Sequence, residues 1–177
     1  MTSYIALLRA VNVGGTSKLA MSDLTTMCEA AGFGSVRTYI ASGNVVFSSS
    51  KAATSVRRTL EQLLLEHAGK PIGVMIRTAN EMAAVLAANP FPDAPANRTV
   101  AIFLDDAPPG DALDRIAGRV DEEVALGRRE IYVRYGAGIG HSKLKIPAAK
   151  LGTARNMNTV AKLAAMAASP SVRARRV

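Results

Sequence analysis

The first 77 residues alternate between short apolar runs and longer stretches in which apolar residues recur every three or four positions. Short runs are typical of strands, and the wider spacing is typical of helices with one buried face. The order of the segments predicts strand, helix, strand, strand, helix, strand, which is the order of a ferredoxin-like unit. The strands are expected at residues 4–11, 36–41, 45–48 and 72–77, and the helices at residues 22–31 and 53–67.

Capping and turn residues set the expected boundaries of these elements. Ser22 has a side chain suited to the N-cap of the first helix, and Gly32 supplies a stop after it. The Ser42-Gly43-Asn44 segment lies between two apolar runs and predicts a tight hairpin. In a two-residue loop of type I′, Gly43 and Asn44 would both have positive φ, which both residue types tolerate.

The rest of the chain is less regular and predicts a second α+β subdomain without an internal repeat. Asn156 or Asn158 is the expected N-cap of a last helix. We expect an α+β fold with a ferredoxin-like subdomain at residues 1–77, an intertwined second subdomain at 78–168 and a disordered basic tail at 169–177. Within the second subdomain, helices are expected at residues 80–88, 111–120 and 147–151, and strands at 100–104 and 130–135.

Composition places the chain among globular proteins of a reducing compartment. No apolar run approaches the roughly 20 residues needed to cross a bilayer. The first residues lack a basic segment ahead of their apolar stretch, which argues against a secretory signal. The single cysteine, Cys28, cannot form an internal disulfide. We therefore expect a cytoplasmic protein that has no membrane partner.

The net charge of +8 is unevenly distributed along the sequence. Residues 128–177 carry 11 basic side chains and one acidic side chain, so this segment alone has a charge of +10. One interpretation is a face that binds an anionic partner. The other is compositional background, because the chain has 15 arginines, 7 lysines and many alanines. The sequence leaves both open.

Two loops are expected to meet at one edge of the first predicted sheet. In the ferredoxin-like order the first two strands run parallel, so the loop at residues 12–18 and the turn at 42–44 follow neighbouring strand ends. Gly14 and Gly15 would let backbone N–H groups approach an anion, and Arg9 and Lys18 could supply positive charge. The spacing matches neither a P-loop nor a dinucleotide fingerprint, so a plain turn is the alternative.

A second glycine-rich stretch at residues 136–140 precedes His141, Ser142 and Lys143. Its backbone donors could hold an anion, although alternating glycines are also typical of a flexible surface connection. His141 is the better acid–base candidate of the two histidines, since His67 ends an amphipathic helix. No metal-ligand or nucleophile motif is present, and we predict neither a metal nor a cofactor. Whether the protein is an enzyme is left open.

Three segments resemble a bacterial family of unknown function. They read RAVNVGGTSKLAMSDL at residues 9–24, VRTYIASGNVVF at 36–47 and TARNMNTVAKL at 153–163, and the usual opening of that family reads Arg-Gly-Ile-Asn-Val-Gly-Gly. The resemblance runs from about residue 3 to residue 168 and implies two intertwined α+β subdomains, with no established activity, substrate or cofactor. Ala10 stands where glycine is usual in the family, and Met157 where tryptophan is usual.

The resemblance also marks polar residues and glycines that core packing does not require. With the loop residues above, they make the predicted ligand-binding set. We expect this set to bind a phosphate-bearing ligand, with nucleic acid favoured over a phosphorylated small molecule. A small-molecule enzyme built on the two loops and a protein-interaction module are the alternatives, and no oligomeric state is predicted. The set comprises Arg9, Asn12, Gly14, Gly15, Lys18, Ser42, Gly43, Asn44, His141, Ser142, Lys143, Arg155, Asn156 and Asn158, with Thr159 beside the last three.

Overall fold

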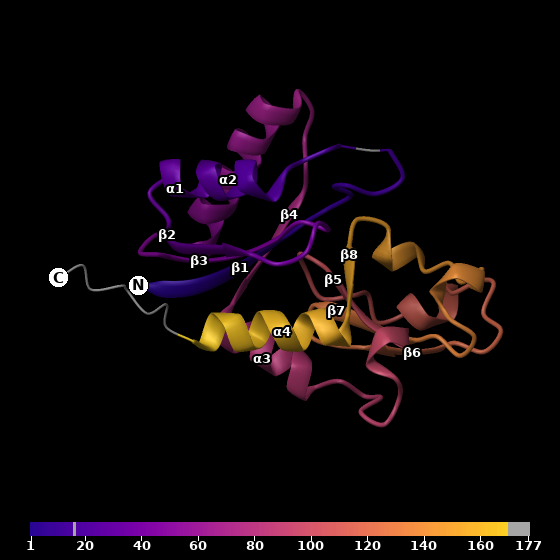
Figure 1. Cartoon of the computed structure of the whole chain (residues 1–177). Coiled ribbons are helices and arrows are strands. Elements are labelled where there is room, and N and C mark those ends of the chain that lie inside the picture. The colour runs from indigo at the N-terminus through magenta and orange to yellow at the C-terminus, as the bar shows by residue number, and fades with distance from the viewer. Residues whose placement is uncertain (16, 170–177) are drawn as a thin grey trace. The chain divides into compact units, whose positions relative to one another are not determined.

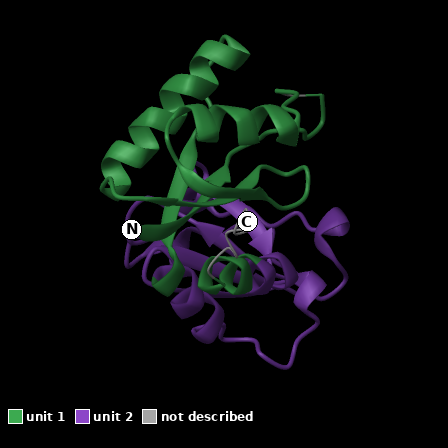
Figure 2. Ribbon diagram, turned by 60° about the vertical axis from the view of Figure 1, so that its left-hand side comes forward, with its two compact units in different colours: residues 1–80, 163–177 green, residues 81–162 purple. Residues whose placement is uncertain are grey.

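The computed structural model of the chain describes residues 1–15 and 17–169. The expected disordered tail, apart from Ser169, lies outside the described residues. The chain divides into two compact units (Figure 2). Unit 1 comprises residues 1–80 with 163–177, and unit 2 comprises residues 81–162.

Unit 1 has the ferredoxin-like βαββαβ order that the sequence predicts (Figure 1). Its four strands form one antiparallel sheet in the order β2-β3-β1-β4, and β3 lies between the parallel pair β1 and β2. The elements are β1 (Thr2–Leu8), α1 (Met21–Ala30), β2 (Gly34–Thr38), β3 (Asn44–Ser49), α2 (Ala53–Ala68) and β4 (Val74–Thr78).

The helices α1 and α2 cover one face of this sheet. Alternate residues of β1, among them Ala6 and Leu8, pack in one core cluster with Leu24, Cys28 and Leu60 of the two helices. Burial raises the pKa of the Cys28 thiol to about 12, with a further contribution from the nearby Glu29 carboxylate. Little of this thiol is therefore ionised at neutral pH, as expected for a structural cysteine rather than a nucleophile.

The other face of the sheet carries the alternate residues, of which Ile5, Leu7 and Val46 are almost fully buried. The C-terminal end of the last helix, α4 (Met157–Ala168), lies along this face. The hydroxyl of Ser3 donates to the carbonyl of Ala167 at 3.0 Å, and the Arg37 guanidinium donates to the carbonyl of Met166 at 2.6 Å. These bonds satisfy carbonyl groups that the end of a helix leaves without partners.

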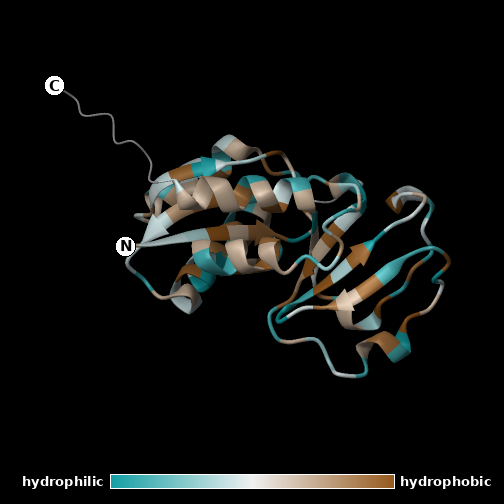
Figure 3. Cartoon of the chain, turned by 90° about the horizontal axis from the view of Figure 1, so that it is seen from below, coloured by the Kyte–Doolittle hydropathy of each residue, from teal (hydrophilic) through white to brown (hydrophobic). Residues whose placement is uncertain are grey.

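Unit 2 contains a second antiparallel sheet, in the order β6-β7-β5-β8. The phenol of Tyr132 donates to the carbonyl of Val85 at 2.8 Å in a buried bond that ties α3 to β7. The elements are α3 (Ala79–Ala87), β5 (Thr99–Phe103), β6 (Glu123–Leu126), β7 (Glu130–Arg134), β8 (Thr153–Asn156) and short 3-10 turns at Ala96–Arg98, Ala112–Arg115, Ile139–His141 and Pro147–Ala149. Strand β1, which starts at the labelled N-terminus in Figure 3, is hydrophobic over most of its length.

The two sheets repeat one strand order, so the expectation of no internal repeat is wrong. Strands β5, β6, β7 and β8 take the places of β1, β2, β3 and β4, with the same directions. Arg77 and Arg155 both lie in the last strand of their sheets, are at least 92% buried, and donate to the carbonyl of the preceding residue at 3.0 and 2.9 Å. A helix begins two residues after each arginine, and the pattern Arg-x-x-Asn-x-apolar-Ala-x-apolar fits both residues 77–85 and 155–163.

Several predicted elements differ from the observed ones. Residues 111–120 form a 3-10 turn and an irregular segment, because Ala117 pairs with Lys145 and Gly118 has a left-handed backbone with φ of 70°. The first strand ends at Leu8 rather than at residue 11, since Ala10 and Asn12 have φ of 54°. Strands β6 and β8 have only four residues each, too few for a clear alternation of apolar and polar positions.

Candidate functional site

The loop between β1 and α1 has an unusual backbone. Ala10 and Asn12 have φ of 54°, and Gly14 and Gly15 have φ of 56° and 78°. Glycine adopts this left-handed region without strain, but residues with a Cβ rarely do. Four left-handed positions within six residues give the loop its shape and keep it from continuing either β1 or α1.

The side chain of Asn12 holds this loop in place. Its Nδ2 donates to the carbonyls of Leu19 and Ala41, each at 2.7 Å, and its Oδ1 accepts from the backbone N–H of Leu19 at 2.8 Å. The backbone N–H of Asn12 also donates to Ser17 at 2.9 Å. Asn12 therefore closes the loop on itself and ties it to the β2–β3 connection, and its amide is already engaged within the protein.

The two loops that the sequence places at one sheet edge do converge. The Asn12–Ala41 bond joins them, and the backbone N–H of Leu8 donates to the carbonyl of Gly43 at 2.8 Å. A Cβ on Gly43 would lie 2.5 Å from Cγ2 of Val11, so only glycine permits this approach. With φ of 85°, Gly43 is also restricted by its backbone conformation.

Asn44 does not have the position that the sequence predicts. It is the first residue of β3, pairs with Leu7 of β1, and has a side chain that is 0% exposed. Its Nδ2 donates to the carbonyl of Tyr39 at 2.9 Å and to the hydroxyl of Ser42 at 3.0 Å. The connection therefore has five residues, Tyr39 to Gly43, rather than a two-residue turn, and the Asn44 amide organises it from inside.

A hollow of about 410 Å³ opens between the loop and the start of α1. It is lined by Asn12, Gly15, Lys18, Leu19 and Ala20. Lys18 is exposed, and a Cβ on Gly15 would meet nothing within 4 Å, so the backbone there is accessible.

The hollow reaches Ala20, the N-cap of α1, and the first turn of this helix has no side-chain cap and carries the acidic Asp23. Ala20, not Ser22, is the N-cap, because the chain stays extended up to Ala20 and Ser22 lies inside the first turn. No side chain of α1 accepts a hydrogen bond from its first N–H groups. A helix N-terminus attracts anions through these N–H groups and the helix dipole. Lys18 and the open glycine backbone add two further anion-binding features beside it.

Backbone strain is concentrated in the two converging loops. Among the described residues, four other than glycine have positive φ, and three of them, Ala10, Asn12 and Ile40, belong to the two converging loops. Ile40 is β-branched, has φ of 51° and is 50% exposed, so its side chain contributes little packing energy to offset the strain. Such strain is typical of functional sites. The sequence contains no signal that marks Ile40, because its residue type favours extended backbone.

The second glycine stretch, residues 136–140 in unit 2, differs from the first loop because acidic side chains lie beside it. It borders a hollow of about 250 Å³. The carboxylate of Asp121 accepts from the backbone N–H of Ala137 at 2.8 Å, and the hydroxyl of Ser142 donates to Glu122. The Ser142 hydroxyl and the N–H of Val120 lower the pKa of Glu122. Two carboxylates thus occupy this site, and they oppose the anion that the sequence predicts at residues 136–143.

His141 and Lys143 are exposed at this second stretch. Gly118 approaches it so closely that a Cβ would lie 2.1 Å from the carbonyl oxygen of Lys143. In the part of the chain that the structure describes, no group of three histidine, cysteine or acidic side chains is placed to hold a metal ion.

The third segment that resembles the family, residues 153–163, forms β8 and the first part of α4. Arg155 is 92% buried in β8 and donates to the hydroxyl of Thr153 at 2.8 Å, and burial lowers its pKa to about 10. Asn156 is the N-cap of α4, since its Oδ1 accepts from the backbone N–H of Thr159 at 3.0 Å. Asn158 is exposed in the first turn. The cap predicted at Asn156 or Asn158 is thus confirmed at Asn156.

The fold redistributes the charge that the sequence concentrates in its last 50 residues. Unit 2 has 11 basic and 10 acidic side chains, a net charge of +1, whereas unit 1 has 11 and 4, a net charge of +7. In unit 2, Arg129 pairs with Glu81 at 2.8 Å and Arg134 with Glu123 at 2.9 Å. Three arginines of the tail, at residues 173, 175 and 176, lie outside the described residues. Without these three arginines, unit 1 has 8 basic and 4 acidic side chains, a net charge of +4, compared with +1 in unit 2.

The architecture defines the class as an α+β protein with two four-stranded antiparallel sheets of the same strand order. Residues 1–132 match the family described as "Protein of unknown function (DUF1697)", and the chain belongs to this family. A solved structure titled as the conserved bacterial protein SP0830 from Streptococcus pneumoniae is similar, with a TM-score of 0.77 and 23% identity over 94% of this chain and 98% of that one. At this identity the likeness shows the fold alone. No curated protein matches the chain.

Within residues 1–15 and 17–169, the structure has no helix with both the length and the apolar character required to span a membrane.

Proposed function

We propose that the protein is a cytoplasmic binder of a phosphate-bearing ligand, held in the hollow between the β1–α1 loop and the first turn of α1. One observation carries the proposal: Asn12 fixes an open glycine loop against an uncapped helix N-terminus, with Lys18 beside it. Backbone N–H groups, a helix dipole and an ammonium group together form the usual means of phosphate recognition.

The internal repeat supplies a comparison within the same chain. The loop after β5 takes the place in unit 2 that the loop after β1 takes in unit 1. After Leu104 it carries Asp105, Asp106 and two prolines, whereas the loop after β1 begins with Arg9 and contains Gly14, Gly15 and Lys18. Of these two equivalent loops, the one in unit 1 has the charge and the backbone freedom for an anion.

The size of the hollow favours a phosphorylated small molecule. About 410 Å³ lies within the usual range for small-ligand pockets, roughly 300–1,000 Å³. The prediction of a nucleic-acid ligand rests on the charge of +10 in the last 50 residues. Within unit 2, acidic side chains largely balance this charge. An oligonucleotide is therefore one arm of the test rather than the first choice.

Replacement of Lys18 by glutamine is expected to weaken binding of inorganic pyrophosphate about tenfold or more, because a charge-assisted hydrogen bond contributes roughly 1.5–3 kcal/mol. Isothermal titration calorimetry of the full chain measures this directly. Lys51→Gln is the matched control, since Lys51 is also exposed in unit 1 but does not line the hollow.

The same titration separates the ligand classes. Binding of a mononucleotide with weak salt dependence supports the small-molecule arm. Binding of a single-stranded oligonucleotide that weakens steeply with salt, by a slope of about −0.7 per phosphate contact, supports the nucleic-acid arm. Equal affinity in the Lys18→Gln and Lys51→Gln variants, or no binding of any of these probes, would contradict the proposal.

A further inference from the structure

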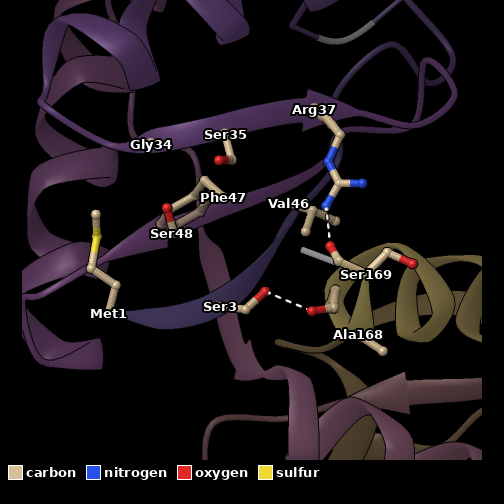
Figure 4. Close-up of a pocket in the computed structure, with 11 residues that line it drawn as sticks. Met1, Ser3, Gly34, Ser35, Arg37, Val46, Phe47, Ser48, Ala168 and Ser169 are labelled. Carbon is tan, nitrogen blue, oxygen red and sulfur yellow. Dashed lines mark hydrogen bonds between the residues drawn. The ribbon is translucent and has the colours of Figure 1, made fainter. Parts of the chain in front are cut away.

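A second and larger hollow of about 630 Å³ lies in unit 1, between β2, the ends of β1 and β3, and the last residues of α4 (Figure 4). Its wall has both polar and apolar parts. The hydroxyls come from Ser3, Ser35, Ser48 and Ser169, and the exposed apolar surface comes from Met1 and Ala168.

Arg37 forms the polar centre of this hollow. One terminal nitrogen of its guanidinium donates to the carbonyls of Met166 at 2.6 Å and Ser169 at 3.4 Å. Its Nε is buried and has no hydrogen-bond partner, and no other buried side-chain nitrogen or oxygen of the described residues is in this state. Figure 4 shows the Nε edge of the guanidinium on the side of Ser35. A charged donor without an acceptor is unfavourable, and Arg37 as a whole is only half-buried, so a small turn of its side chain would let this edge pair with an oxygen from outside the protein.

The backbone of β2 helps to open the hollow. The pairing with β3 shifts between Gly34 and Arg37, and Ser35 has φ of 53°, so the strand bulges here. A Cβ on Gly34 would lie 2.7 Å from the hydroxyl oxygen of Ser48. A side chain at this position would therefore displace that hydroxyl.

We propose that this hollow binds a small carboxylate with a short aliphatic chain. The carboxylate oxygen accepts from Nε of Arg37, and the chain lies against the exposed side chains of Met1 and Ala168. A singly charged anion suits the site better than a phosphate dianion, because the carbonyl groups at the end of α4 place partial negative charge beside Arg37. The site shares no lining residue with the loop hollow and does not depend on the function proposed there.

The arginine Nε–H signal in a nitrogen-15 NMR spectrum of the full chain tests the proposal. Acetate, butyrate and hexanoate are the probes, with chloride at equal ionic strength as the reference. We expect a saturable shift of the Arg37 signal and an affinity that rises about fourfold for each added methylene, since each methylene leaves water for an apolar wall. Arg58→Lys, on an exposed position of α2, should bind as the unmodified chain does.

Two variants keep the test decisive. Arg37→Lys retains a donor toward the end of α4 but removes Nε, so it should lose carboxylate binding. Gly34→Ala keeps Arg37 and narrows the hollow, so it should weaken hexanoate binding at least tenfold. An Arg37 signal that responds to the carboxylates no more than to chloride would assign Nε to a water molecule and overturn the proposal. Undiminished binding by Gly34→Ala would overturn the assigned location.

Discussion

Replacement of Gly118 by alanine is expected to lower the free energy of unfolding by more than about 3 kcal/mol, because the change combines backbone strain with a clash. Gly118 has φ of 70°, and a Cβ would lie 2.1 Å from the carbonyl oxygen of Lys143. That oxygen is backbone, and the bridge between Ala117 and Lys145 holds it in place. Urea unfolding followed by circular dichroism measures the effect.

The chain offers a closely matched control for this change. Gly69 has φ of 69°, but a Cβ there would meet nothing within 4 Å. Gly69→Ala should therefore cost only the left-handed backbone penalty, roughly 1–2 kcal/mol. Equal losses in the two variants would show that the Gly118–Lys143 approach does not constrain unit 2.

Replacement of Asn12 by alanine is expected to cost about 2–4 kcal/mol and to abolish pyrophosphate binding. Three side-chain hydrogen bonds are lost, each with a net contribution of roughly 0.5–1.5 kcal/mol, and alanine is strained at φ of 54°. The loop would then no longer be held open beside α1. The measurements are urea unfolding and calorimetry on the same preparation.

Asn12→Gly separates the two causes. Glycine removes the hydrogen bonds but accepts the left-handed backbone, so it should recover about 1 kcal/mol relative to alanine while still losing the ligand. If either variant bound pyrophosphate as tightly as the unmodified chain, the hydrogen bonds of Asn12 would have no role in shaping the site.

The fold of unit 1 could be predicted because its signals are local and agree with each other. Apolar runs, helical spacing and the stop at Gly32 all lead to one strand order. Unit 2 was harder to predict because its crossovers lack long helices and two of its strands have four residues. The repeat escaped detection because it is preserved as strand order and as one spaced pattern after Arg77 and Arg155, not as similar sequence.

The candidate site was predictable in place but not in detail. Strand topology was sufficient to bring the loop at residues 12–18 to the β2–β3 connection. Residue type alone could not show that the amides of Asn12 and Asn44 are used inside the protein, since a polar residue serves a loop or a ligand equally well. The strain at Ile40 was also inaccessible, because it arises from contacts that are distant in the sequence.

The most direct test of the loop site is a map of backbone amide shifts in nitrogen-15 NMR spectra as inorganic pyrophosphate is added to the full chain. The site predicts saturable shifts at Gly14, Gly15 and Lys18 and at the first two residues of α1, Met21 and Ser22. Saturable shifts confined to other residues, or no shift beyond that produced by chloride at equal ionic strength, would contradict it.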